Sequence, residues 1–460
     1  MLYIFQHTMD ITQLAHVFGC LMKKDQQWYA SPLALDPHLV DQTQFNHVVH
    51  IQPIIQKLKS ILINNPHYIK ALKGLNDDFV DNLLLCRKLK SIEFGIIRSD
   101  YISDANGVLK NVETNCIASS FSCLSSRVSK IHQILSNTSR IVPNQCILQE
   151  ALNTACTHYN EACTPTDPSI FLPLSKSTSI VSDMCILMIV QPTETNLSDQ
   201  LGLLDGLQYP MFRITFDQVF DLQIIHDTLV YNNKYKVAVV YYRSGYQPND
   251  YPSQRQWDAR RILEHSNAIN CPSVSLQLMG LKKIQEMTST RDVLFETLKN
   301  EEEVNLLLST YMALYPMDQD TKEGQLALQL VREAPEKYVL KPQREGGSNN
   351  YYDQAILKHL DGLKHVDEYK KYILMEKIVS STSQMNTLIR FMNGHYTKVK
   401  GATISEIGVY GYFIKYNNRE AGLVVNKAGG YLTRTKLIGT NEGGVASGYS
   451  YLNSLQFDGQ

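Results

Sequence analysis

Two runs of consecutive apolar residues, at 185–190 and 237–242, most constrain how this chain can fold. Because every position is apolar rather than every second one, a strand built from either run must be buried on both faces. Segments that can form helices follow the two runs, at 193–200 and 257–265. Doubly buried strands that alternate with helices are typical of a parallel sheet. We therefore expect a small parallel α/β unit over residues 180–281.

The rest of the chain mixes helices and strands in another way. Residues up to about 90 show helical periodicity interrupted by polar turns. Strand-like runs at 94–101 and 108–115 flank Asn106-Gly107. Asn-Gly between two strands predicts a hairpin, because both turn positions favour positive φ. With the parallel unit, this order of elements predicts a mixed α/β (α+β) fold.

Net charge and hydropathy argue against several classes of protein. The 44 Lys and Arg residues nearly balance the 45 Asp and Glu residues, whereas a dedicated nucleic-acid binder usually carries a basic field. No apolar run approaches the ~20 residues that span a bilayer. His7 and Asp10 interrupt what would be the core of a signal peptide. We therefore expect a cytoplasmic protein that binds neither nucleic acid nor membranes.

The nine cysteines point to reduced thiols rather than to a disulfide framework. No two of them show a CxxC or another zinc-like spacing. A chain of 460 residues can bury a large core without disulfides.

A strand that ends in Lys341 leads directly into a Gly-rich loop. The backbone N–H groups at Gly346 and Gly347 can surround phosphate oxygens, and Lys341 adds a positive charge. Glu345 can hold Mg²⁺, which takes carboxylates together with substrate phosphates. A polar turn at the surface would show the same residues. Walker A and GxGxxG patterns are absent from the sequence, so the common nucleotide motifs do not decide the matter.

Glu113 and Asn115 form a second candidate site, on the second strand of the predicted hairpin. Two residues apart on a strand, they project to the same face. A carboxylate beside an amide oxygen can supply two Mg²⁺ ligands. Arg98 and Asp100 are also two apart on the partner strand, so the turn can bring both pairs to one surface. The alternative is an outward polar face of an ordinary hairpin.

Two further segments carry charges that suit an anionic ligand. Arg243 follows the apolar run at 237–242, and ligands of parallel sheets collect at the carboxyl ends of the strands. An arginine there can bind a carboxylate through two hydrogen bonds, or it can simply leave the core for solvent. Near the C-terminus, Arg434 and Lys436 precede a loop of small residues at 442–448. That loop can close over a ligand or remain a flexible tail.

Together these segments resemble the eukaryotic-type glutathione synthetases, a family of ATP-grasp ligases. The motifs that carry the resemblance are IIRSDY at 96–101, VETNCIASSF at 112–121, VAVVYYRSGYQP at 237–248, KPQREGGSNN at 341–350, YILMEKI at 372–378, SEIG at 405–408 and RTKLIGTNEGGVASG at 434–448. They occur in the family's order over nearly the whole chain.

The resemblance implies an ATP-grasp fold with an inserted small parallel α/β substrate-binding domain and a lid domain. The implied division is a main body with N-terminal helices and β-hairpin (1–179), the substrate-binding domain (180–281), a return to the main body (282–319), a lid region with the Gly-rich loop (320–420) and the C-terminal part of the main body with the small-residue loop (421–460). A homodimer is the family's usual assembly.

The resemblance also implies a role for each matching residue. The metal ligands would be Glu113, Asn115 and Glu345. The ATP site would contain Lys282, Lys341, Gly346, Gly347, Asn350, Tyr352, Met375, Glu376, Ile378, Glu406 and Lys436. The peptide substrate or product would be held by Arg98, Ser120, Gln200, Arg243, Tyr246 and Arg434, and the glycine end by Val445 and Ala446. Arg98, Lys341 and Arg434 would act directly on the reaction.

The implied reaction joins γ-glutamylcysteine to glycine at the expense of ATP, with Mg²⁺ as cofactor, through an acyl phosphate. Such a reaction needs cations near developing negative charge more than a protein nucleophile, so Cys116 is expected to be structural. By the same resemblance, Val445-Ala446 implies glycine rather than β-alanine or serine as acceptor. The competing hypotheses are a ligase for one of those other acceptors and a nucleotide-binding relative without ligase activity.

Overall fold

The protein is represented by a computed structural model that describes residues 10–24, 26–136, 139–163, 183–343, 349–380, 384–418, 422–441 and 443–459. Helices and strands are mixed along this whole range, which confirms the predicted mixed α/β class. The helices are α1 (Ile11–Val17), α2 (Gln42–Leu62), α3 (Pro66–Lys73), α4 (Asp78–Cys86), α5 (Ser122–Ser136), α6 (Ile147–Cys163), α7 (Leu197–Leu201), α8 (Gln254–His265), α9 (Val274–Leu278), α10 (Lys282–Met287), α11 (Arg291–Leu298), α12 (Glu301–Thr310), α13 (Lys322–Glu333) and α14 (Gln354–Asp361). None of these described helices is both long and apolar enough to cross a lipid bilayer.

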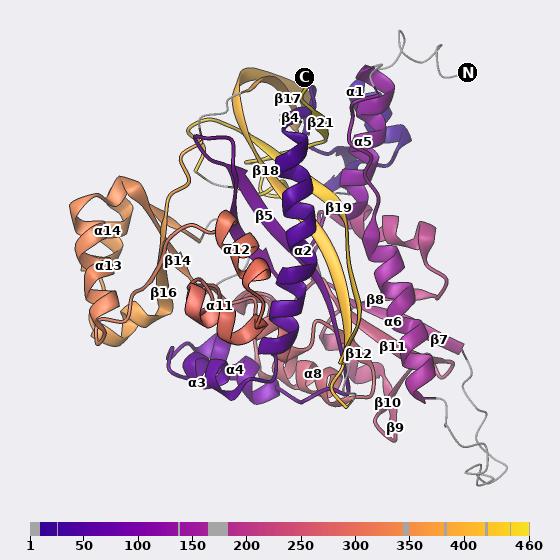
Figure 1. Ribbon diagram of the computed structural model, residues 1–460. Helices are drawn as coiled ribbons and strands as arrows, with labels where there is room; N and C mark the ends of the chain where they lie inside the picture. Colours follow the sequence, from indigo (N-terminus) through magenta and orange to yellow (C-terminus); the bar gives the residue numbers. More distant parts are fainter. Residues whose placement is uncertain are drawn as a thin grey trace, which may run out of the picture.

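A seven-stranded sheet forms the centre of the molecule. Its strand order is β17 (Gln384–Met392), β3 (Leu33–Ala34), β20 (Tyr451–Asn453), β19 (Leu423–Leu437), β18 (His395–Tyr416), β5 (Ile92–Ser103) and β6 (Leu109–Asn115). Helix α2 crosses one face of the long strands, while α5 and α6 lie on the other side of the sheet (Figure 1). Strands β5 and β6 pair antiparallel around the Asn106-Gly107 turn, so the predicted hairpin is confirmed.

Alternation along these strands separates a core face from a polar face. Tyr101 of β5 and Val409 of β18 share an apolar cluster with Val48 of α2. Their neighbours in sequence, Asp100 and Gly408, are register partners and therefore point to the opposite face, away from α2. The polar face holds the charged residues described below.

The second sheet contains the two apolar runs from which the sequence analysis began. Its strands are β8 (Met211–Ile214), β7 (Asp183–Ile189), β11 (Tyr235–Tyr242), β10 (Thr228–Tyr231) and β9 (Gln223–Ile225) in that order, with β12 (Ile269–Cys271) also paired to β11. Strands β8, β7, β11 and β12 pair in parallel, as predicted. The antiparallel β9–β10 hairpin was not predicted, because His226-Asp227 takes positive φ at its turn without the Asn-Gly signal.

A third sheet forms a separate lobe with its own core. Its order is β13 (Leu314–Pro316), β16 (Tyr372–Glu376), β14 (Tyr338–Pro342) and β15 (Tyr351–Tyr352). Helices α13 and α14 cover it, and Figure 1 shows the lobe standing to one side of the central sheet. Residues 384–416 lie in the central sheet rather than in this lobe, so the expected lid range 320–420 spans two sheets. Two short pairs complete the described strands: β1 (Leu21–Lys24) with β2 (Gln27–Ala30), and β4 (His38–Val40) with β21 (Leu455–Phe457).

Two buried histidines, His38 and His132, predict how folding stability depends on pH. His132 Nδ1 lies 2.7 Å from Ser454 Oγ and Nε2 lies 3.0 Å from the Ala34 carbonyl. Burial lowers the pKa of both His132 and His38 to about 4. Between that value and the ordinary ~6.5 the unfolded chain binds more protons, so stability is complete above about pH 6.5 and falls as the pH drops toward 4.

Each histidine is therefore expected to remove roughly 2 kcal/mol of stability between pH 7 and pH 5. Urea unfolding midpoints at the two pH values measure this. A His132→Gln variant should show a smaller decrease than the wild type, whereas exchange of the exposed His395 for Gln should leave the decrease unchanged. Equal decreases in all three proteins would contradict the assignment.

Candidate active site

Four strands of the central sheet bring acidic and basic side chains onto one polar face. Arg98 is the register partner of Asn115, and Asp100 is the register partner of Glu113. The expectation that the hairpin places both pairs on one surface is confirmed by this register. On the neighbouring strands, Glu406 of β18 faces Arg434 of β19.

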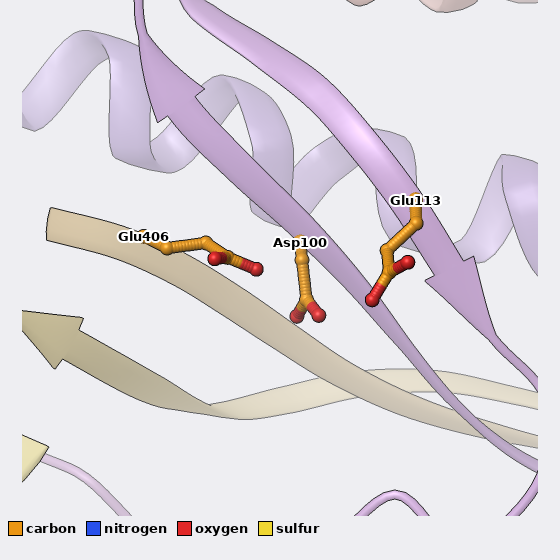
Figure 2. A group of neighbouring side chains, drawn as sticks. All are labelled: Asp100, Glu113 and Glu406. Carbon is orange, nitrogen blue, oxygen red and sulfur yellow. The ribbon is translucent and has the colours of Figure 1, made fainter. Parts of the chain in front are cut away.

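Three carboxylates lie together on this face. One carboxylate oxygen from each of Asp100, Glu113 and Glu406 is within 4.8 Å of the others, and the three side chains converge from β5, β6 and β18 (Figure 2). Such a group is stable only where cations compensate it. Burial raises the pKa of Glu406, against the opposing charge of Arg434.

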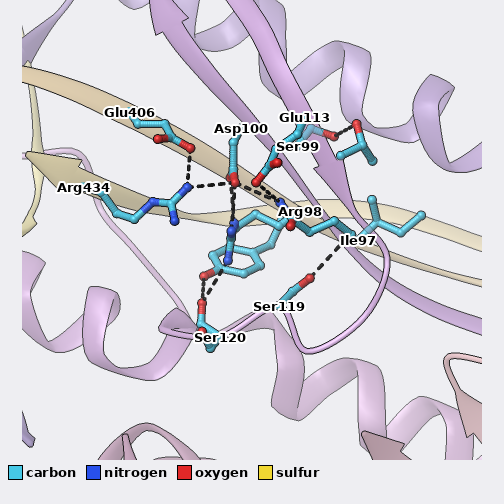
Figure 3. A network of polar contacts seen from close by, with 12 residues as sticks. Ile97, Arg98, Ser99, Asp100, Glu113, Ser119, Ser120, Glu406 and Arg434 are labelled. Atoms are coloured by element: carbon cyan, nitrogen blue, oxygen red, sulfur yellow. Dashed lines mark hydrogen bonds and ion pairs between the residues drawn. The ribbon is translucent and has the colours of Figure 1, made fainter. Parts of the chain in front are cut away.

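Asp100 is the hub of the charge network. It is fully buried and accepts hydrogen bonds from Arg98 Nε at 2.6 Å and from Arg98 Nη2 at 2.8 Å. Arg434 Nη2 lies 3.0 Å from Asp100 Oδ2 and also contacts Glu406 (Figure 3). Asn115 Nδ2 donates to the same oxygen of Asp100 at 2.9 Å. The sequence had placed Asp100 beside Arg98 without assigning it this role.

Two buried lysines approach the carboxylates from other elements. Lys282, at the start of α10, donates to Glu113 Oε2 at 3.0 Å. Lys341, in β14 of the third sheet, donates to the Val112 carbonyl at 2.9 Å. Burial lowers the pKa of Lys341 to about 8. Burial alone would raise the pKa of Glu113, but the two lysines beside it hold that pKa well below its usual range.

A second charged cluster lies at the carboxyl end of β7 and β11, where the sequence predicted an anion site. Arg243 Nη1 pairs with Asp199 Oδ2 at 3.0 Å, and both side chains are almost fully buried. Gln200 Nε2 donates to Glu194, while Gln200 Oε1 accepts from Arg213 Nε at 2.8 Å. The sequence did not reveal the role of Asp199, because its partners lie far away along the chain.

The loop between β6 and α5 joins the two clusters. Asp199 accepts hydrogen bonds from the backbone N–H groups of Phe121 at 2.8 Å and Cys123 at 3.1 Å. The carbonyl of Ser120 accepts from Arg98 Nη1 at 3.4 Å and from the Tyr410 hydroxyl. Each cluster therefore holds one side of the same short loop.

The other predicted site residues lie around these clusters or in the third sheet. Tyr246 accepts from Gln191 Nε2 at 3.2 Å, and Lys436 donates to the Asn441 carbonyl at 3.1 Å. Val445 is 1% exposed and packs in the core, whereas Ala446 is exposed. The third sheet contains Tyr352, Met375 and Glu376. Asn350 directly precedes its strand β15, and Ile378 follows its strand β16. Glu345, Gly346 and Gly347 lie outside the described residues.

Comparison with known proteins places this arrangement in a family. The model of the eukaryotic glutathione synthase, ATP binding domain, matches residues 4–457. The glutathione synthetase large chain of Schizosaccharomyces pombe is 32% identical, covering 92% of this chain and 90% of its own. The glutathione synthetase of Homo sapiens is 31% identical, over 95% and 93%. The structure of a glutathione synthetase like-effector from Globodera pallida has the same fold, with a TM-score of 0.73, 18% identity, and 97% and 94% coverage. The chain belongs to the eukaryotic glutathione synthase family.

Proposed function

We propose that this protein joins γ-glutamylcysteine to glycine in an ATP-dependent reaction that releases ADP and phosphate. The observation that carries the proposal is the polar face where Arg98, Arg434, Lys282 and Lys341 surround three carboxylates. A structural ion pair would not need four cations converging from separate elements. A reaction between a carboxylate, a polyphosphate and an amine has to collect negative charge, and a buried set of cations stabilises it.

Different residues are proposed to bind the two ends of the peptide substrate. Arg98 and Arg434 would bind and orient the cysteinyl carboxylate, whose oxygen attacks the γ-phosphorus of ATP while ADP leaves. Glycine's amine then attacks the acyl carbon and phosphate leaves. Ser120 lies in the shared loop, which Asp199 links to Arg243. Together with Arg243, Gln200 and Tyr246 it would hold the other end of the dipeptide.

Lys341 and Lys282 are proposed to bind the ATP phosphates. Lys341 comes from the third sheet and reaches β6, so it also ties that lobe to the central sheet. Met375 and Glu376 lie on the adjacent strand β16, where Val339 of β14 pairs with Met375. The third sheet would thus supply the nucleotide pocket and cover the reacting groups from water.

Mg²⁺ fits the carboxylate group on the central sheet. Glu113 stays ionised because of its lowered pKa, and carboxylate oxygens are the ligands that Mg²⁺ prefers. Asn115 lies beside it but directs its amide nitrogen to Asp100 and Glu113. We propose Glu113, Asn115 and Glu345 as ligands, with Glu406 and Asp100 nearby. When bound, Mg²⁺ would neutralise charge on the phosphates and polarise the γ-phosphoryl group.

ADP release by the purified protein tests the activity. The protein would be incubated with Mg-ATP and γ-glutamylcysteine, alone or with glycine, β-alanine or serine. Glycine-dependent ADP release with glutathione as the product supports the proposal. Faster ADP release with β-alanine or serine than with glycine would mean that the faster amine is the acceptor. No release with any acceptor, from folded protein that still binds ATP, would indicate a nucleotide-binding relative.

Gly408 is expected to be essential because it leaves room for the charge network. A Cβ at this position would lie 2.5 Å from Asp100 Oδ1 and 2.7 Å from Arg98 Cδ, so the buried pair would have to move. A displacement of about 1 Å at a reacting group can cost roughly 10²-fold in rate. Gly408→Ala should therefore lower kcat/KM by about that factor.

Gly74→Ala is the matched control, because its added Cβ meets only the Ala71 carbonyl, at 3.4 Å. Circular dichroism would establish that both variants fold. Wild-type kcat/KM in folded Gly408→Ala would show that the Asp100–Arg98 geometry does not matter for the rate.

Assembly and location are proposed from the family resemblance. We propose a homodimer that works in the cytoplasm. Light scattering after size-exclusion chromatography should give twice the chain's mass, and a monomer mass at micromolar concentration would contradict the dimer.

A further inference from the structure

Two cysteine thiols face each other outside the charge network. Cys123 lies in the first turn of α5, and Cys146 directly precedes α6. Their sulfur atoms are 3.0 Å apart, in contact but not bonded. A disulfide needs a sulfur–sulfur distance of about 2.05 Å, so an approach of about 1 Å would close the bond. The pair is therefore close to the geometry of a disulfide while both thiols are reduced.

One of the two cysteines is more exposed than the other. Cys123 is 3% exposed, whereas Cys146 is half-buried. Both cysteines line a cleft of about 530 Å³, whose charged side chains are Arg127, Lys130 and Asp205. Asp205 pairs with Arg127, so a small molecule that enters this cleft meets Cys146 and an excess of one positive charge, that of Lys130. The volume and the net charge of the cleft suit a compact anion.

The surroundings also divide the chemical roles between the two sulfurs. The hydrogen bond from the Cys123 thiol lowers the pKa of Cys146, against burial, and Ser122 and the Leu148 backbone N–H act in the same direction. The same hydrogen bond, together with burial, raises the pKa of Cys123. The sulfur of Cys146, the more exposed residue, is thus the better thiolate, and a thiolate is the species that attacks a disulfide.

We propose that Cys123 and Cys146 form a reversible redox site that reacts with small disulfides carrying carboxylate groups. The Cys146 thiolate attacks one sulfur of the oxidant, whose disulfide bond breaks and releases one thiol. Cys123 then attacks the Cys146 sulfur in the mixed disulfide and releases the second thiol. The two protein thiols lose two electrons and two protons, and the oxidant gains both as two thiols.

The site lies next to the peptide end of the proposed active site. The backbone N–H of Cys123 donates to Asp199 at 3.1 Å, and Asp199 pairs with Arg243. Glutathione disulfide is the natural probe because it is a compact disulfide with several carboxylates. It is also the oxidised form of the proposed product, and this last link alone depends on the proposed function. The redox site itself does not, because its readouts are masses of the protein.

Mass spectrometry of the reduced protein after incubation with glutathione disulfide tests the proposal. The wild type should lose about 2 Da, and a non-reducing digest should contain a peptide cross-linked between Cys123 and Cys146. Cys123→Ser should stop at a glutathione adduct on Cys146, and Cys146→Ser should stay reduced at Cys123. Cys86→Ser, which removes a buried thiol that contacts the Trp257 carbonyl, should behave as the wild type. A folded wild type without the cross-link, or a Cys146→Ser variant that reacts at Cys123 as fast as the wild type reacts, would overturn the proposal.

A charge variant tests the class of oxidant. Lys130→Gln should slow the reaction with glutathione disulfide several-fold and leave the reaction with neutral bis(2-hydroxyethyl) disulfide unchanged. Added salt should slow the wild type with the first oxidant and not with the second. Equal rates of variant and wild type with glutathione disulfide would overturn the recognition of carboxylates.

Discussion

Replacing Glu113 with glutamine is expected to lower kcat by roughly 10²–10³-fold, the usual effect of removing one electrostatic contact from a preorganised site. Glutamine keeps the shape of the side chain and removes its charge. Lys282 then loses the carboxylate at 3.0 Å from its Nζ, and the proposed Mg²⁺ site loses the group that the two lysines keep ionised. ADP release under saturating substrates measures kcat, and thermal unfolding measures whether the fold is kept.

A neighbouring ion pair provides the control. Lys283 follows Lys282 on α10 and pairs with Glu286 at 2.6 Å, outside the carboxylate group. Glu286→Gln also removes the carboxylate partner of an α10 lysine and should leave kcat within about twofold of the wild type, as for a pair remote from the reacting groups. If Glu113→Gln kept wild-type kcat, the carboxylate would have no part in the reaction. If both variants lost activity equally, disturbance of the α10 lysines, and not loss of the carboxylate from the site, would explain the result.

Replacing Asp100 with asparagine is expected to cost about 3 kcal/mol of folding stability, because removing one partner of a buried ion pair leaves the other charge uncompensated. Asp100 is fully buried and Arg98 is nearly so, and two guanidinium groups depend on this one carboxylate. Arg434 keeps Glu406 as a second partner, whereas the described ion pairs give Arg98 only Asp100. Urea unfolding at pH 7 measures the loss.

The reason for the loss can be tested with a second substitution. Arg98→Met in the Asp100→Asn background removes the stranded charge and should recover part of the stability. Asp217→Asn breaks an exposed pair with Arg255 and should cost less than about 1 kcal/mol. No recovery in the double variant would mean that Asp100 stabilises the fold through something other than compensation of Arg98.

Local patterns in the sequence predicted much of the architecture. Consecutive apolar residues at 237–242 predicted a doubly buried strand, and β11 occupies this position between two parallel neighbours. The Asn106-Gly107 turn predicted the hairpin of β5 and β6, and the register of its strands, with a bulge between Asp100 and Tyr101, puts Arg98 and Glu113 on a common face. Such features depend on residues close together in the chain, so a single sequence contains them.

Contacts between distant segments were not readable in the same way. The roles of Asp100 and Asp199 depend on which strands and helices meet, and neither residue stands in a motif that announces a partner. Gly408 does not lie in a turn. The need for glycine there becomes clear only from the structure, in which Arg98 and Asp100 occupy the space that a Cβ would fill. The division of residues 320–420 between two sheets likewise follows from long-range pairing of β17 and β18.

The most direct test of the proposed reaction follows an oxygen atom. γ-Glutamylcysteine labelled with ¹⁸O in both oxygens of its cysteinyl carboxylate would be incubated with the protein, Mg-ATP and glycine, and the phosphate released would be analysed by mass spectrometry. An acyl-phosphate route passes one carboxylate oxygen to phosphorus, so each phosphate should carry one ¹⁸O and the glutathione formed should retain the other. Glycine-dependent phosphate without ¹⁸O would mean that water, not the peptide carboxylate, attacks ATP, and the proposed ligase reaction would be wrong.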